Sequence, residues 1–139
     1  MGLDMYLNAR RYYYRDDTPT IEGIPHGYHI NNIEVGVTSW RKANAIHQWF
    51  VENVQNGEDN CVPHSVTRDD LKALVDTCKT VIAEPEKAPE LLPTTDGFFF
   101  GGTEYGEYYF DCLNYTVEQV EKAMTGFSEE WVFEYQSSW

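Results

Sequence analysis

Residues 67–82, TRDDLKALVDTCKTVI, carry the clearest structural pattern in the chain. Thr67 is followed three residues later by Asp70, which predicts a capping box at a helix start, with Asp in the usual place of Glu. Apolar side chains then recur at helical spacing, at Leu71, Leu74, Val75, Cys78, Val81 and Ile82. The stretch is therefore predicted to be an amphipathic helix that packs one face on a core.

Segments on both sides of this helix alternate in the manner of strands. A first strand is predicted over residues 3–14, a second over about 28–38 and a last one over 131–135. Residues 16–27, between the first two strands, are rich in Asp, Pro and Gly and are expected to form a loop.

Two further helices are predicted from apolar periodicity. One runs from about Trp40 to Gln55 and stops at Asn56-Gly57. The other begins at Thr116 as its N-cap and shares an apolar face made of Val117, Val120, Ala123, Met124 and Phe127.

The stretch between the second and third helices is predicted to hold no helix. Pro85, Pro89 and Pro93 indicate a rigid, acidic connector, and residues 97–112 read as two short strands joined around Gly101-Gly102. The predicted element order is then β-β-α-α-β-β-α-β. We expect an α+β fold, with an antiparallel or mixed sheet packed by about three helices, in a single domain over residues 1–139.

The composition predicts a folded, strongly acidic protein. The chain is 42% hydrophobic and 15% aromatic, and 23 acidic residues against 10 basic ones give a net charge of −13. No run of Lys and Arg exceeds two residues, so direct binding of duplex DNA is not expected. Two explanations of the acidity stay open: solubility, or imitation of nucleic-acid phosphates that attracts a basic partner.

Cysteine usage and the N-terminus predict a cytoplasmic location. The three cysteines are an odd number, which favours a reducing compartment over a disulfide framework. No signal peptide and no apolar run of membrane-spanning length are found, so no membrane association is expected.

Metal and catalytic motifs are weak, and neither a cofactor nor a catalytic residue is predicted. His26-x-x-His29 and Cys61-x-x-His64 offer zinc-type ligands, but neither spacing matches a standard zinc module. Glu104, Glu107 and Asp111 lie among tyrosines, as in sugar-cleaving sites, yet such proximity is common in so acidic a chain.

A binding site is the more informative expectation. Arg41, Lys42 and Asn44 open the predicted Trp40–Gln55 helix, and a helix N-terminus favours anions. On a helical wheel Trp49 falls beside Lys42, outside the apolar arc, which predicts an exposed stacking surface. The candidate ligand-binding residues are Arg41, Lys42, Asn44, His47, Trp49, Gln136 and Ser137.

His47 and Trp49 each have a second interpretation. The helix can pack on the sheet with Trp49 completing a second hydrophobic cluster, instead of exposing it. His47 lies in the apolar stripe, so a hydrogen-bonded core histidine is the alternative to a ligand contact. Gln136 and Ser137 reach a site only if the C-terminus folds back. The terminal Trp139 predicts that the chain end is docked, on its own domain or on a partner.

Five blocks of the sequence resemble an uncharacterised family of small acidic proteins encoded by bacteriophages and prophages. They are MGLDMYL (1–7), WRKANAIHQWFV (40–51), GFFFG (97–101), TEY (103–105) and YQSSW (135–139). The resemblance spans the whole chain and implies a phage accessory protein that acts inside a bacterium. It implies no activity and no site residue.

Together these observations favour a non-enzymatic binding protein that counteracts or modulates a host defence system. Two mechanisms are expected: an acidic surface that binds a basic host protein, or capture of a small anionic, nucleotide-like ligand. A small hydrolase acting on a nucleotide or a glycan is the alternative, and self-association into a homo-oligomer stays open.

Overall fold

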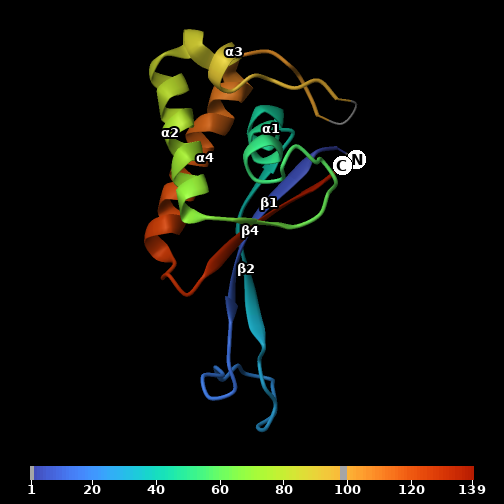
Figure 1. Cartoon of the computed structure of the whole chain (residues 1–139), viewed down its shortest axis with the longest axis vertical. Coiled ribbons are helices and arrows are strands. Elements are labelled where there is room, and N and C mark those ends of the chain that lie inside the picture. Colours follow the sequence, from blue (N-terminus) through green and yellow to red (C-terminus); the bar gives the residue numbers. More distant parts are fainter. Residues whose placement is uncertain (1, 98–99) are drawn as a thin grey trace.

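The computed structural model describes residues 2–97 and 100–139, which form one four-stranded sheet and several helices (Figure 1). The strands are β1 (Asp4–Tyr12), β2 (Asn32–Arg41), β3 (His64–Val66) and β4 (Val132–Ser138), in the spatial order β2-β1-β4-β3. All neighbouring pairs are antiparallel. The predicted α+β class with an antiparallel sheet is confirmed, and the short strand β3 is an addition that periodicity did not predict.

The sheet buries one face under the helices and leaves the other face open. Alternate residues of the two central strands are buried, namely Met5, Leu7 and Ala9 of β1 and Phe133, Tyr135 and Ser137 of β4. Tyr6, on the opposite face of β1, is exposed. The buried face supports the helices that form the candidate site.

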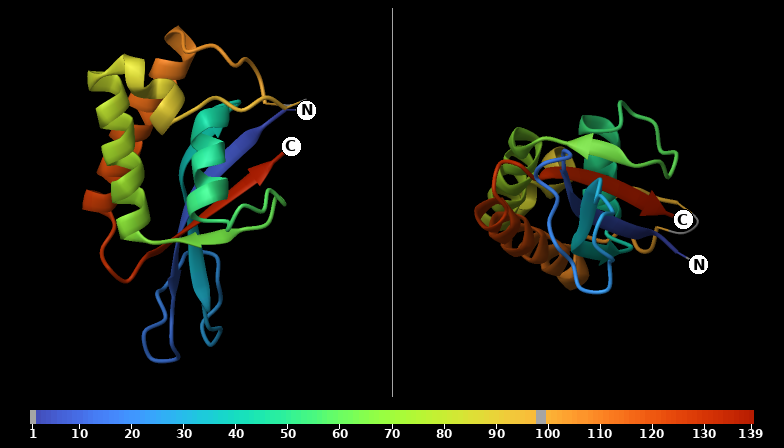
Figure 2. Two further views of the ribbon diagram at one scale, coloured as in Figure 1. Left: turned by 45° about the horizontal axis from the view of Figure 1, so that its top comes forward. Right: turned by 90° about the horizontal axis from the view of Figure 1, so that it is seen from below.

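The β1–β2 hairpin extends beyond the rest of the molecule. Leu7 faces Thr38 and Asn8 faces Gly36, so Val37 is an extra residue in β2 and forms a bulge. The long connection over residues 13–31 forms the far end of the hairpin, away from the helices (Figure 1, Figure 2).

The helix predicted over Trp40–Gln55 begins later than expected. Helix α1 covers Asn44–Asn53, while Trp40 and Arg41 pair with β1 as the last residues of β2. Lys42, with a φ of 54°, turns the chain between strand and helix. Trp40 fitted the helical stripe because it packs on the same core from the end of the strand.

Helix α2 (Arg68–Ala83) begins with the predicted capping box. The Thr67 hydroxyl accepts a hydrogen bond from the Asp70 N–H group, and the Asp70 carboxylate accepts one from the Thr67 N–H group. Where a rigid connector was predicted, the chain forms a 3-10 turn, η1 (Pro85–Lys87), and a one-turn helix, α3 (Ala88–Leu91).

Two sequence predictions are wrong in the region that forms helix α4 (Glu107–Gly126). Residues 107–112 were predicted as a strand but form its first turns, and Thr116, the predicted N-cap, is buried in its middle. The helical period prevails because α4 presents one apolar face to the core, made of Tyr109, Leu113, Val120 and Ala123. The first predicted strand of 97–112 included Phe98 and Phe99, which lie outside the described residues.

Arg68 joins the start of α2 to the end of α4. Its guanidinium donates hydrogen bonds to the carbonyl oxygens of Met124 (3.1 Å), Phe127 (3.0 Å) and Ser128 (2.8 Å). The last carbonyl groups of a helix have no partner within the helix and carry a partial negative charge. The Arg68 guanidinium donates hydrogen bonds to these carbonyl groups and places a positive charge beside them. Arg68 therefore stabilises the packing of α2 against α4.

We expect Arg68→Ala to lower the free energy of unfolding by about 2 kcal/mol, because it removes charge-assisted bonds to helix-terminal carbonyls. Arg68→Lys should recover only part of the loss, since an ammonium group lacks the planar fork. Urea denaturation measures both. Lys72→Ala is the matched control, because Lys72 pairs with Asp76 at the exposed surface. An Arg68→Ala loss no larger than the control's contradicts this role.

Candidate functional site

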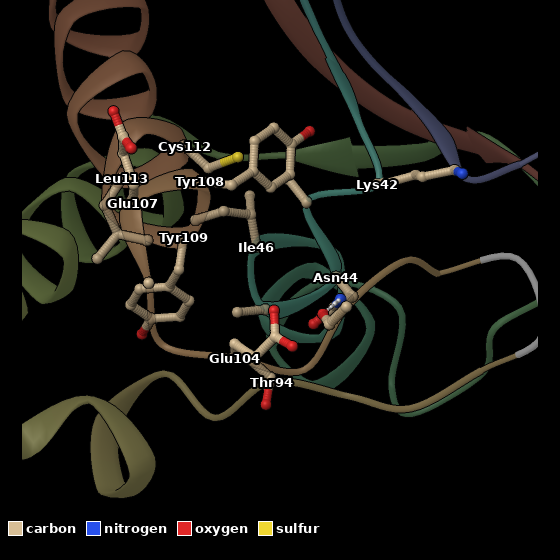
Figure 3. A pocket seen from close by; sticks show the side chains of 14 residues that line it. Lys42, Asn44, Ile46, Thr94, Glu104, Glu107, Tyr108, Tyr109, Cys112 and Leu113 are labelled. Carbon is tan, nitrogen blue, oxygen red and sulfur yellow. Dashed lines mark hydrogen bonds between the residues drawn. The ribbon is translucent and has the colours of Figure 1, made fainter.

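A cavity of about 290 Å³ lies between the beginnings of α1 and α4 (Figure 3). One wall is the turn from Lys42 to Ile46, and a second is the first turns of α4, from Gly106 to Leu113. Thr94, Gly102 and Glu104, from the segment between α3 and α4, complete the lining. The cavity lies just below the usual range of roughly 300–1,000 Å³ for small-molecule sites, so it suits a small ligand.

Both helices that begin at this pocket have free N–H groups. The N-cap residues are Ala43 for α1 and Gly106 for α4, and neither provides a side-chain cap. Among the described residues, no acceptor binds the N–H groups of residues 44–46 or 107–109. Free donors and a partial positive charge at a helix start attract anions, and here two helices offer them to one pocket.

Asn44 fixes the loop that closes the pocket. Its side-chain amide donates to the carbonyl oxygens of Phe100 (2.9 Å) and Gly102 (2.8 Å), and its carbonyl oxygen accepts from the Thr95 N–H group at 2.9 Å. All these bonds join α1 to residues more than 50 positions away. Asn44 is therefore a positioning residue for the pocket wall.

The charged groups at the pocket are mainly acidic. Glu104 and Glu107 line it, and Lys42 is its one basic lining residue among those described. In Figure 3 the Lys42 side chain extends away from the other lining residues. Gly101 has a φ of 82°, and a Cβ atom there would lie 3.1 Å from the Lys42 Cβ, so this close approach requires glycine. The carboxylates can accept hydrogen bonds from ligand hydroxyl groups.

Tyr108 and Cys112 line the pocket in their neutral forms. Burial raises the pKa of the Tyr108 hydroxyl to about 12, and this hydroxyl donates to the Arg41 carbonyl oxygen. Burial likewise raises the pKa of the Cys112 thiol, so no thiolate nucleophile is available at neutral pH. The exposed Tyr108 ring offers a surface on which a planar group can stack.

The structure brings three of the predicted site residues together. Lys42 and Asn44 line the pocket, and Arg41 lies beside it through the bond from Tyr108. Sequence patterns did not single out Thr94, Gly102 or Gly106 as ligand-binding, although these residues also line the pocket. The neighbouring Glu104 and Glu107, with the tyrosines around them, had been considered only as a weak sugar-cleaving pattern.

The other four predicted site residues lie elsewhere. Trp49 is only 9% exposed and packs edge-on against Phe50, so the predicted exposed stacking surface is wrong. The wheel had placed it beside Lys42, which is not part of the helix. Gln136 donates to the Cys61 carbonyl oxygen, and the Ser137 side chain is buried.

His47 is a hydrogen-bonded core histidine, the alternative that the sequence left open. Its Nδ1 lies 2.6 Å from the Tyr135 hydroxyl and its Nε2 lies 2.9 Å from Asp59 Oδ1. With a neutral ring, Tyr135 donates to Nδ1 and the Nε2–H group donates to the carboxylate. Trp139 Nε1–H donates to the same Asp59 oxygen, and its ring meets Phe100 edge-on. The C-terminus is thus docked on its own domain.

The free energy of unfolding should decrease as the pH is lowered, because His47 is buried in its neutral form. Burial lowers the pKa of His47 below its usual 6.5, although the bond to Asp59 opposes this shift. Below about pH 6.5 the unfolded chain therefore binds a proton that the folded chain does not, and folding loses up to about 1.4 kcal/mol per pH unit from this group. Denaturation of wild type and His47→Gln between pH 7 and 5 measures it.

The control for this experiment is His26→Gln, because His26 is exposed. The wild type and His26→Gln should share one steep pH profile, and His47→Gln should give a shallower one. Equal slopes in all three proteins would contradict a neutral, buried His47.

The described residues hold no group of three or more His, Cys, Asp and Glu side chains arranged to bind a metal ion. His29 contacts Thr18 and His64 contacts Asn60, so two of the four zinc-type residues have other local partners. Within residues 2–97 and 100–139, no helix combines the length and apolar character needed to cross a lipid bilayer.

No protein-family model matches the chain, and no curated protein or solved structure matches it either.

Proposed function

We propose that this chain is a phage-encoded, non-enzymatic binding protein that counteracts or modulates a host defence system by sequestering a small nucleotide-like ligand. The observation that carries the proposal is the pocket into which the uncapped N-termini of α1 and α4 both open. The sequence resemblance to phage and prophage proteins supports the setting.

The pocket offers a partner for each part of a mononucleotide. A phosphate group accepts hydrogen bonds from the free N–H groups of residues 44–46 and 107–109. Ribose hydroxyls donate to the carboxylates of Glu104 and Glu107, as acidic side chains do in dinucleotide sites. The base stacks on the exposed Tyr108 ring, which contributes roughly 1–3 kcal/mol.

The charge of the pocket restricts the ligand to about one negative charge. Two carboxylates line the pocket, the Lys42 side chain extends away from it, and the whole chain carries −13. A polyphosphate would be repelled by this field. A cyclic mononucleotide or a similar phosphodiester fits best, and its affinity should rise with salt because salt screens the repulsion.

Calorimetric titration tests the proposal with cyclic mononucleotides, nucleoside monophosphates and nucleosides that lack phosphate. We expect saturable binding of the phosphate-bearing compounds, with unmodified ligand recovered afterwards. Absence of binding by any nucleotide would overturn the proposal. Binding followed by conversion to a product would favour the hydrolase alternative, with Glu104 and Glu107 as its acidic groups.

Gly106→Asp is expected to weaken nucleotide binding about tenfold or more. A Cβ at this position meets no atom within 4 Å, so the substitution is tolerated. The new carboxylate caps the N–H groups of α4 and repels a phosphate there. Gly106→Asn is the matched control, since it caps the helix without adding charge and should bind more tightly than Gly106→Asp. Equal affinities would place the phosphate away from α4.

A basic host protein is the second candidate partner, because α4 also carries an acidic stripe. Glu107, Asp111 and Glu118 are exposed at spacings that share one helix face, and none pairs with a described basic side chain. Partner capture from host lysate, compared between wild type and a Gln/Asn variant at these positions, tests this mechanism. Its binding should weaken with salt, the opposite of the trend expected for a captured anion.

A further inference from the structure

The projecting hairpin is the part of the molecule that the pocket does not explain. We call residues 10–31 the arm; it holds the end of β1 and the whole connection to β2. A connection of this length without helix or strand is uncommon in a compact domain and usually has a function. The arm points away from the helices and from the candidate site (Figure 1, Figure 2).

Contacts within the arm give it a defined shape. The Arg11 guanidinium lies 4.8 Å from the centre of the Tyr13 ring and pairs with Asp17 at 3.3 Å. Thr18 contacts His29 across the loop, and its hydroxyl also donates to the Arg15 carbonyl oxygen. A surface that is ordered before binding loses little conformational entropy when a partner arrives.

The arm offers both a projecting ring and a hollow. Tyr14 is 82% exposed, the highest value among the large exposed apolar side chains of the described residues. A cavity of about 460 Å³ lies within the loop, with a mixed lining: apolar side chains such as Pro19, Ile21, Ile24 and Tyr28 alternate with polar ones such as Thr18, Thr20, His26 and His29. Tyr14 is not part of this lining. Buried aromatic side chains that fill pockets dominate the energetics of protein interfaces.

Charge favours a second copy of this chain as the occupant. Arg10, Arg11 and Arg15 balance Asp16, Asp17 and Glu22, so the arm has no net formal charge and the −13 of the chain lies outside it. The acidic parts of two copies outside the arm repel each other. Because the arm has no net charge, two arms can contact each other while these acidic parts stay apart. An interface takes roughly 20–30 residues from each side, and the arm provides about that many.

We propose that two copies associate through their arms, with the amphipathic Tyr14 side chain of each copy seated in the mixed hollow of the other: its ring meets the Ile and Pro side chains and its hydroxyl meets the polar ones. A two-fold contact needs one surface that is complementary to itself, and the ring and the hollow of the arm meet that requirement. The free edge of β2 is less suited to pairing, because the bulge at Val37 interrupts the regular ladder that an added strand requires.

Sedimentation velocity of the full chain over a wide concentration range tests the proposal. We expect a dimer whose affinity rises with salt, because salt screens the repulsion between the acidic parts outside the arm. Tyr14→Ser, in the ring, and Ile24→Glu, in the hollow, should each weaken dimerisation by about tenfold or more. Val62→Ser is the matched control, since Val62 is an exposed apolar residue outside the arm, and it should leave the dimer unchanged.

Circular dichroism of each variant separates loss of contact from loss of folding, and native spectra are expected because both side chains are exposed. A wild-type protein that stays monomeric at every concentration would overturn the proposal. A dimer that survives both arm substitutions would also overturn it. A wild-type monomer whose arm binds a different protein would overturn it as well. Dimerisation is measured independently of nucleotide binding. The dimer proposal can therefore fail while the proposed function stands.

Discussion

Phe50→Ala is expected to lower the free energy of unfolding by about 3–5 kcal/mol. Phe50 is fully buried, and its ring stacks on Tyr135 with centroids 3.8 Å apart and planes 8° apart. It also meets Trp40 and Trp49 edge-on, at 6.0 and 5.4 Å. The substitution removes the side chain that joins α1 to β2 and β4 and leaves a cavity among rigid rings.

Guanidinium denaturation measures this effect. Phe50→Leu should cost much less, because it retains most of the buried apolar volume. Val62→Ala is a surface control, because Val62 is exposed, and should change stability by less than about 0.5 kcal/mol. A Phe50→Ala loss no greater than that of the leucine variant would contradict the seating of α1 on the sheet.

Asn44→Ala is expected to lower the free energy of unfolding by about 2–4 kcal/mol and to open the pocket. It removes three hydrogen bonds and leaves the Phe100 and Gly102 carbonyl oxygens and the Thr95 N–H group without their partner. Residues 94–97 and 100–106 then lose their hydrogen bonds to Asn44 of α1. We therefore expect nucleotide affinity to fall by tenfold or more while the sheet stays folded.

Hydrogen exchange locates this effect along the chain. Amide exchange should accelerate at Thr95 and in its neighbours and stay unchanged in β1 and β4 of Asn44→Ala. Asn44→Asp keeps an acceptor for the Thr95 N–H group but loses both donors, so it should protect Thr95 more than Asn44→Ala does. Unchanged exchange at Thr95 in the alanine variant would show that Asn44 does not position the wall.

The sequence predicted the elements whose signals are local. The capping box at Thr67 and Asp70 lies within four residues, and the stripe of α2 repeats over four turns. Alternation located β1, β2 and β4, because one face of the sheet is buried and the other is open. Strand β3 has three residues, too few to show a period.

The errors occurred where tertiary contacts override local patterns. Residues 107–112 are rich in Tyr and Phe, which favour strands, yet they lie on the helix that packs against α2. Trp40 continues a helical period but stays in β2 because it pairs with β1 and its Nε1–H group donates to Thr116. In both cases a distant partner decides the conformation.

The pocket was only partly predictable for the same reason. Lys42 and Asn44 were selected because helix starts attract anions, and that rule depends on adjacent residues. The second helix start at Gly106 and the loop from Thr94 meet the first through partners more than 50 residues apart, by the bonds of Asn44 and the bond from Tyr108 to Arg41. No local period encodes such a meeting.

The central claim is that the two helix starts bind one phosphate-bearing ligand. Titration of the isotopically labelled protein with a cyclic mononucleotide, followed by the amide resonances, tests it most directly. The account predicts saturable shifts at residues 44–46 and 107–109 together, with one common dissociation constant. Shifts confined to other residues, or no shift at either helix start, would contradict it.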